Sequence, residues 1–151
     1  MHIYKIDSGD YTSVNGARTL LQLVAGSTRR SKILEIGVSF ASVTSTDAPV
    51  LVELGTETSA GTSSSFTPLP LDPADPAAIQ TALNTFSSTE PTGFTAIGAG
   101  PWRVTPIGGT FVYQWPAGDE PRVAISTRFA LRVTTAASLS TAIRAYLIYQ
   151  E

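Results

Sequence analysis

The chain contains no cysteine and only one histidine, His2, among its 151 residues. Disulfide bonds, thiolate metal sites and a cysteine nucleophile are therefore excluded. The usual zinc ligand sets and the histidine-dependent catalytic triads cannot be assembled from one histidine. No glycine-rich segment has the length and placement of a phosphate-binding loop. The sequence thus predicts a protein that is not an enzyme and that uses no metal or cofactor.

Charge is also scarce, because 15% of the residues are charged, against about 25% in a typical soluble domain. Serine and threonine occupy roughly a quarter of the positions and replace charge as the main surface polarity. The net charge is −2, with acidic and basic residues interspersed. Because no basic stripe is present, nucleic acid is not expected as a partner.

Long apolar runs are absent as well, so no membrane helix is predicted and no membrane partner is expected. The first residues, MHIYKIDSGDY, lack the basic and apolar regions of a signal peptide. We therefore expect synthesis in the cytoplasm without a classical export signal.

Alternation of apolar and polar residues is the dominant pattern that is present. In KILEIGVSFA the apolar face is predicted to hold Leu34, Ile36, Val38 and Phe40. In PVLVELG it holds Val50, Val52 and Leu54, and in RFALRVT it holds Phe129, Leu131 and Val133. Further strand candidates are HIYKI, RTLLQLV, WRVTPI, TFVYQW, PRVAIST and TAIRAYLIYQ. About nine or ten short strands in so small a chain predict an all-β, two-sheet antiparallel sandwich, jelly-roll-like or immunoglobulin-like in strand order.

Two local signals make sharper predictions about individual segments. DPAAIQTALN is the one helical candidate, since Asp75 can cap it and Pro76 can occupy the first helical position; at most one short helix is expected, near residues 76–83. PIGGTF predicts a hairpin between the strands WRVTPI and TFVYQW, because a glycine pair suits the tight turn.

The stretch FTPLPLDPADPAAIQ, residues 66–80, carries four prolines. Strand patterns continue unchanged on both sides of it, so it is not a domain linker, and residues 1–151 are predicted to form one domain. Proline fixes φ and lacks an amide donor, which keeps such a segment out of a sheet interior. We therefore expect a stiff surface crossover that connects the two sheets and contacts a neighbouring subunit. Residues 1–16 are expected to form an arm or a first strand.

Acidic residues offer two alternatives to this structural interpretation. Glu35 and Glu53 lie on predicted outward faces, where a glycosidase would need two carboxylates across a cleft. Cross-strand ion pairs with Arg128 or Arg132 are the favoured interpretation. Asp72 and Asp75 have the oxygen donors that calcium prefers, but they lack a dense acidic run, so turns are favoured.

Aromatic residues suggest a further alternative, a stacking platform for sugar rings. The candidates are Trp102, Tyr113, Trp115, Tyr146 and Tyr149. Phe111, Tyr113 and Trp115 share one face with period two, as a core face does, and a core position is favoured. A small-molecule ligand is therefore not expected.

Six segments in order, including TLLQLVAGSTRRSKILEIGVSFA, TPLPLDPADPAA, GGTFVYQWPAGDEPRVA and LSTAIRAYLIYQE, carry a family resemblance. Over residues 17–151 the chain resembles small β-sandwich proteins encoded by tailed bacteriophages and prophages, especially of actinobacteria. This resemblance implies a virion structural protein, in particular a head decoration or cement protein on the outer capsid surface. Such a protein bridges major capsid subunits, often as a homotrimer, and the family offers no catalytic residues.

The candidate contacts with the capsid or with a second subunit come from the proline-rich stretch and from the first residues of the chain. They are Pro68, Pro70, Asp72, Pro73, Asp75, Pro76, His2 and Tyr4. Two other roles remain open at this point. One is a structural protein of the tail or baseplate, and the other is a module that binds a carbohydrate or a receptor.

Overall fold

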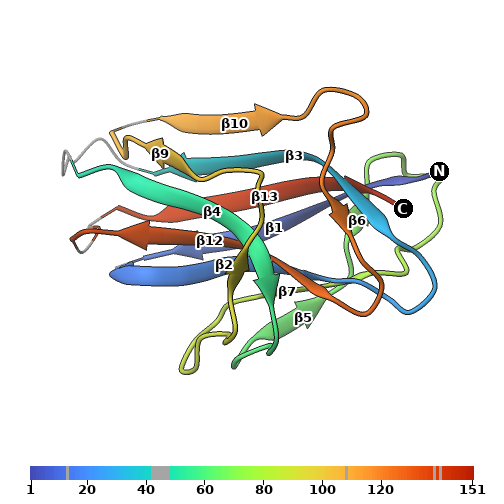
Figure 1. Ribbon diagram of the computed structural model, residues 1–151, viewed down its shortest axis with the longest axis horizontal. Coiled ribbons are helices and arrows are strands. Elements are labelled where there is room, and N and C mark those ends of the chain that lie inside the picture. Colours follow the sequence, from blue (N-terminus) through green and yellow to red (C-terminus); the bar gives the residue numbers. More distant parts are fainter. Residues whose placement is uncertain (13, 42–47, 108, 138, 140) are drawn as a thin grey trace.

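A computed structural model describes residues 1–12, 14–41, 48–107, 109–137, 139 and 141–151. These residues form two antiparallel sheets packed face to face and contain no helix (Figure 1). The N- and C-termini lie side by side at one end, where the backbones of His2 and Glu151 exchange two hydrogen bonds of 3.1 Å. The predicted all-β sandwich is confirmed.

The first sheet has the strand order β10-β3-β13-β1-β6, with β11 also paired to β3. Its long central strands are antiparallel neighbours, and the short β6 forms one edge. The bounds are β1 (Ile3–Tyr11), β3 (Ser31–Phe40), β6 (Leu69–Pro70), β10 (Thr110–Gln114), β11 (Arg122–Val123) and β13 (Ile143–Gln150). Residues 3–11 thus form the first strand, which was one of the two predicted alternatives.

The second sheet has the order β5-β7-β2-β12-β4-β8, with β9 also paired to β4. The bounds are β2 (Gly16–Val24), β4 (Val50–Glu57), β5 (Ser64–Phe66), β7 (Thr81–Asn84), β8 (Thr95–Ala96), β9 (Trp102–Val104) and β12 (Arg128–Thr135). The four longest consecutive strands, β1 to β4, alternate between the two sheets. The last two long strands, β12 and β13, insert between them. The orders β1-β13-β3-β10 and β2-β12-β4-β9 are those of a jelly roll.

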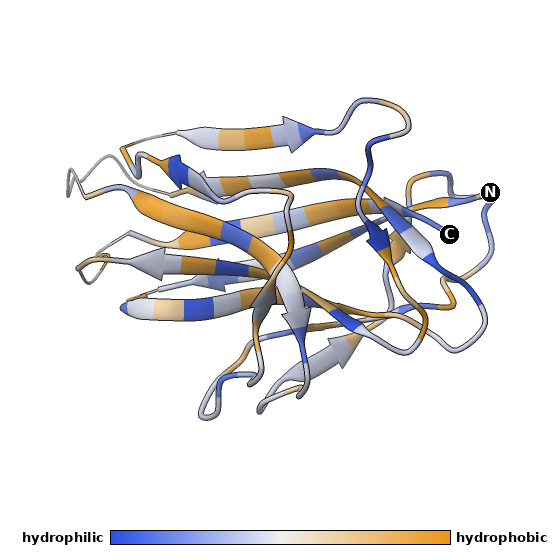
Figure 2. Cartoon of the chain, viewed as in Figure 1, coloured by the Kyte–Doolittle hydropathy of each residue, from blue (hydrophilic) through white to orange (hydrophobic). Residues whose placement is uncertain are grey.

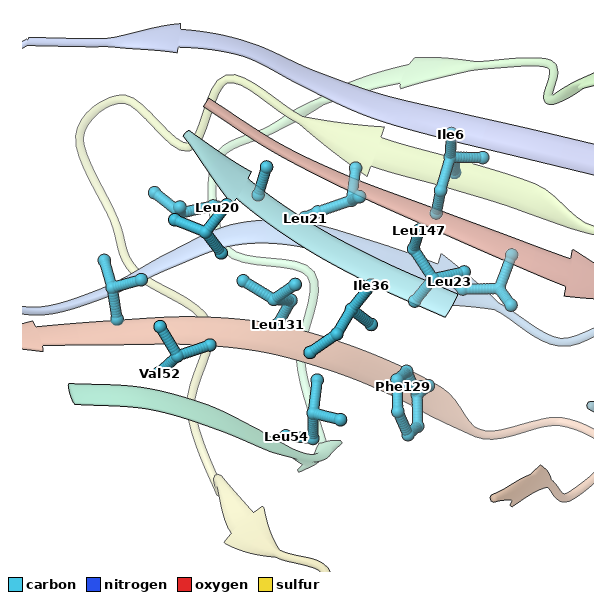
Figure 3. Close-up of a cluster of buried hydrophobic side chains, with 14 of the residues drawn as sticks. Ile6, Leu20, Leu21, Leu23, Ile36, Val52, Leu54, Phe129, Leu131 and Leu147 are labelled. Carbon is cyan, nitrogen blue, oxygen red and sulfur yellow. The ribbon is translucent and has the colours of Figure 1, made fainter. Parts of the chain in front are cut away.

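Buried aliphatic side chains from both sheets fill the space between the layers (Figure 3). The apolar faces predicted for β4 and β12 are both buried, with exposures of 0–2% for Val50, Val52, Leu54, Phe129, Leu131 and Val133. Figure 2 shows an unbroken hydrophobic stretch at the start of β4, followed by a hydrophilic and then a hydrophobic band. Period-two alternation therefore predicted the core of the central strands correctly.

The inward face of β3 differs from the prediction at one end of the strand. Ile36, Val38 and Phe40 are buried as expected. Leu34 is only half-buried, whereas Ile33, predicted to face outward, is fully buried. The pairing of β3 with β13 shifts register at this point, and such a bulge moves the following side chains to the opposite face.

The helix considered near residues 76–83 does not form. Residues 71–75 form a turn, and β7 begins at Thr81 and pairs with β2 on one side and β5 on the other. Ala82 and Leu83 are buried in this strand. Tertiary pairing with two strands has overridden the helical propensity of the alanines.

The predicted PIGGTF hairpin is also wrong. β9 pairs with β4 in the second sheet, and β10 pairs with β3 in the first. The two strands are therefore sequential in the chain but not partners. One residue of the glycine pair, Gly108, lies outside the described residues.

Candidate functional site

The proline-rich segment, residues 66–80, crosses between the sheets as predicted. It leaves β5 in the second sheet, supplies β6 to the edge of the first, and returns to β7 in the second. Within the crossover itself, Leu69 and Pro70 pair with a strand, opposite Lys5 and Tyr4 of β1. A proline on an edge strand removes no hydrogen bond from a sheet interior.

Contacts with the first residues of the chain hold this segment in place. The structure brings predicted residues together here: His2 Nδ1 lies 2.7 Å from Asp75 Oδ1. The Tyr4 hydroxyl donates to the carbonyl oxygen of Pro76 at 3.0 Å. Ile79 N donates to a carboxylate oxygen of Glu151 at 2.9 Å. The segment is therefore fixed along its length despite having little regular structure.

The predicted contact residues divide into accessible and inaccessible ones. Asp72, Pro73 and Pro76 are exposed, and His2, Pro70 and Asp75 are half-buried. Tyr4 is 0% exposed and stacks on Tyr149, with ring centroids 5.6 Å apart. Pro68 is buried as well. Tyr4 and Pro68 are therefore buried and offer no exposed side-chain surface for the partner contact that was predicted for them.

Three aliphatic side chains of the same segment were missed by the sequence analysis. Leu69 is 71% exposed, Leu71 is 52% exposed and Ile79 is 47% exposed. A hollow of about 590 Å³ lies beside the first two, between Phe66 and Lys5. The signal in the sequence was the alternation of leucine with proline in TPLPL, which places apolar residues where no sheet can cover them. We call Leu69, Leu71 and Ile79 the aliphatic patch.

Asp72 and Asp75 form a turn, as predicted. Asp72 Oδ1 accepts a hydrogen bond from the amide of Ala74 at 2.9 Å, and Asp75 N donates to the Asp72 carbonyl at 3.0 Å. This is the short-range pattern of an aspartate that starts a turn. In the part of the chain that the structure describes, no three acidic, histidine or cysteine side chains are grouped to hold a metal.

Glu35 and Glu53 cannot flank a common cleft, because β3 and β4 belong to different sheets. Glu53 Oε2 accepts hydrogen bonds from Arg132 Nε and Nη2 at 3.2 and 3.1 Å, so the predicted cross-strand pair is confirmed. Glu35 instead accepts a hydrogen bond of 2.5 Å from the Tyr146 hydroxyl. Burial and this carboxylate raise the pKa of Tyr146 to about 12.

Glu57, at the end of β4, is the acidic side chain that was missed. It is 5% exposed and accepts hydrogen bonds of 2.6 Å from both Thr19 Oγ1 and Gln22 Nε2. Burial raises the pKa of its carboxyl above the ordinary value, although the two hydrogen bonds oppose this rise. Compared with the unfolded chain, the folded state thus shifts the Glu57 carboxyl toward its protonated form.

The variant Glu57→Gln should have a flatter dependence of stability on pH than the parent protein. Because the folded-state pKa is raised, this group's favourable contribution is present below its ordinary pKa of 4.5 and declines as pH rises through the folded-state pKa. Glutamine remains neutral, can accept from Gln22 and can donate to Thr19. Thermal melting from pH 4 to 8 measures the difference, and parallel curves for the two proteins would contradict the assignment.

An aromatic cluster bridges the open edge of the sandwich, where β9 and β10 face each other. The Trp102 ring centroid lies 5.7 Å from that of Phe111, 4.9 Å from that of Tyr113 and 6.2 Å from that of Trp115. Trp102 comes from the second sheet and Phe111 and Tyr113 from the first. All four rings are only half-buried although they pack against the core. The cluster is therefore an edge of the core with an open side.

Of the other two aromatic candidates, Tyr149 is buried against Tyr4 and Tyr146 lies beside Lys5 on the first sheet. Neither joins the cluster. The open side of the cluster is a hollow of about 660 Å³, which we call the aromatic pocket. Its walls are the loop 97–101, the rings of Trp102, Tyr113 and Trp115, and the segment that runs from Asp119 into Arg122 at the start of β11.

Gly100 sets the position of the Trp102 ring. Its φ is +123°, and a Cβ atom added there would lie 2.8 Å from the indole. A side chain at this position would be strained and would push against the ring. The absence of a side chain at Gly100 therefore allows the Trp102 ring to keep its position as one wall of the aromatic pocket.

Comparison with known proteins gives no match, either with a protein family model or with a curated protein or a solved structure. Among the described residues, no helix is long and apolar enough to cross a membrane. The function must therefore be argued from the proline-rich segment and the aromatic pocket themselves.

Proposed function

We propose that the protein is a non-enzymatic structural protein of a tailed-phage virion, a decoration protein that binds the outer head surface and stabilises contacts between major capsid subunits. The observation that carries the proposal is the aliphatic patch on the proline-rich segment. Three large apolar side chains with exposures of 47–71% lie on one short segment. Of these, Leu69 and Leu71 line one hollow, and exposed apolar side chains grouped in this way on a surface mark an interaction site.

The proline-rich segment is well suited to docking because it is already ordered. Its prolines fix φ, and hydrogen bonds from Tyr4 and to Glu151 hold its backbone. A preorganised segment loses little conformational entropy when a partner covers it, so more of the contact energy remains as affinity. Asp72, exposed beside the patch, supplies charge at the rim.

The proposed action is mechanical. A stiff sandwich that touches two capsid subunits, or a homotrimer that sits at a three-fold position, adds contacts that must break before the shell opens. Modest individual interfaces suffice, because many copies act on a symmetric shell. Synthesis in the host cytoplasm and location on the finished head are part of this proposal.

Quantitative mass spectrometry of purified virions, combined with labelling of the protein on the particle, tests the location. We expect hundreds of copies on the head. A handful of copies at the tail would overturn the head assignment and favour the tail or baseplate alternative. Absence from the particle would contradict any virion role.

The aliphatic patch is tested with Leu69→Ser on capsids that lack the protein. We expect the variant to lose at least tenfold in capsid affinity, because an exposed anchor that becomes buried on binding contributes most of its transfer free energy. Ile125→Ser is the matched control, since Ile125 is 46% exposed outside the patch. Equal binding by both variants would show that the patch is not the docking surface.

A further inference from the structure

The aromatic pocket presents ring faces in a concave arrangement. The interplanar angle is 41° between Trp102 and Tyr113 and 76° between Tyr113 and Trp115. The rings therefore line two sides of the hollow instead of lying in one plane. These rings are half-buried and keep one side accessible, unlike the fully buried rings of Tyr4 and Tyr149.

Polar groups without an internal partner surround these rings. The side chains of Tyr113 and Asp119 make no hydrogen bond or ion pair with the rest of the described chain, and neither has a buried unsatisfied atom. The indole nitrogens of Trp102 and Trp115 likewise make no hydrogen bond with the rest of the described chain, and neither is a buried unsatisfied atom. Arg122, which interacts electrostatically with Glu120, adds a cation to the rim. The pocket thus offers apolar faces together with hydrogen-bond donors and an acidic acceptor.

Three ligand classes stack on aromatic rings, and the polar groups distinguish them. A single-stranded nucleic acid needs a basic groove, but Arg122 is the one basic residue among the described residues of the lining, and the net charge is −2. A proline-rich peptide presents mainly carbonyl acceptors to its groove, which the Asp119 carboxylate would repel. A saccharide presents an apolar C–H face for stacking and hydroxyl groups that can donate to a carboxylate and accept from indole, phenol or guanidinium groups.

We propose that the aromatic pocket binds a saccharide, with a sugar ring stacked against the Trp102, Tyr113 and Trp115 cluster and its hydroxyl groups bound by Asp119 and Arg122. The volume of about 660 Å³ is in the usual range for small-molecule sites, which is about 300 to 1,000 Å³. The site is a binding site and includes no bond-breaking step.

The position of the pocket makes this activity separate from capsid docking. β9 and β10 lie at one edge of the two sheets, whereas β6 and the proline-rich segment lie at the opposite edge. A protein docked through the aliphatic patch would keep the aromatic pocket open to the medium. The saccharide would then be a glycan of a surrounding surface, such as a bacterial envelope polysaccharide.

Tryptophan fluorescence reports directly on this pocket, because Trp102 and Trp115 are the two tryptophans of the chain. The full chain is titrated with oligosaccharides of glucose, galactose, mannose and N-acetylglucosamine, with isothermal calorimetry as a second readout. We expect at least one series to give a saturable change in emission with a matching heat of binding. Asp119→Ala should weaken that binding about tenfold or more, because it removes a charged hydrogen-bond acceptor.

Val112→Ala is the matched control, since Val112 lies on β10 beside Tyr113 but is 49% exposed and outside the pocket lining. It should leave saccharide affinity unchanged. The proposal is overturned if neither readout shows binding to any series, if Asp119→Ala binds as well as the parent, or if a polyproline peptide binds and the saccharides do not. Leu69→Ser should retain saccharide binding, so failure of the docking proposal and failure of this one are distinguishable.

Discussion

Replacing Leu131 with alanine is expected to lower the free energy of unfolding by roughly 3 kcal/mol. Leu131 is 0% exposed and lies on β12, the central strand of the second sheet. It stands opposite Leu21 on one neighbouring strand and Leu54 on the other. Truncation leaves a cavity that three paired strands cannot close by local movement, so both transfer energy and packing are lost.

Chemical denaturation of the purified variant measures this loss, with Val112→Ala as control. Val112 is aliphatic and on a strand, but it is 49% exposed, so its truncation should change stability by no more than about 0.5 kcal/mol. Similar losses for the two variants would mean that the second sheet does not form the core described above.

The alternation of apolar and polar residues was sufficient to predict the buried face wherever a strand lies in the middle of a sheet and has no bulge. The alternation in residues 50–57 and 128–135 predicted the buried faces of β4 and β12, because both strands have partners on each side and one face against the core. The same logic failed at Leu34, and a similar break in the alternation occurs in β2. Leu20 and Leu21 are adjacent yet both buried, since β2 shifts register against β12 there. A bulge depends on the partner strand, which a single segment does not reveal.

Partner choice explains the other errors as well. The alanines of residues 76–83 favour a helix in isolation. However, β2 and β5 each pair through their backbones with β7, which contains the last residues of this segment. The glycine pair before β10 favours a hairpin, but the neighbouring strand belongs to the other sheet. Both outcomes follow from contacts distant in sequence, which propensity does not include.

The two candidate sites differed in how far they could be predicted. The crossover of the proline-rich segment followed from proline chemistry alone, which acts within a residue or two. The aromatic pocket needed the structure, because Trp102 reaches the cluster from one sheet and Tyr113 from the other. Period two correctly grouped Phe111, Tyr113 and Trp115 on one face. It did not show that β10 is an edge strand, where such a face stays half-open.

Gly55→Ala is expected to lower the free energy of unfolding by roughly 2 kcal/mol, the range of an overpacked site. Gly55 pairs with Ala96 of β8, and an added Cβ would lie 2.5 Å from the carbonyl oxygen of Thr95 and 2.6 Å from the Phe94 ring. The backbone carbonyl of Thr95 cannot move aside as the end of a flexible side chain can. β8 must therefore move away from β4. The Arg132 guanidinium, 3.6 Å from the Phe94 ring centroid, would lose its cation–π contact with that ring.

The displacement should also reach the aromatic pocket, because β8 continues directly into the loop 97–101 that forms one wall. We therefore expect Gly55→Ala to shift tryptophan emission without any ligand, together with the loss of stability. Gly26→Ala is the control, since a Cβ added there makes only ordinary contacts of 3.4 Å or more and Gly26 lies outside the aromatic pocket lining. If Gly55→Ala were as stable as Gly26→Ala with unchanged emission, β8 would not be packed on β4 as described. A shift in tryptophan emission, by contrast, would show that the packing of β8 on β4 affects the geometry of the proposed saccharide site.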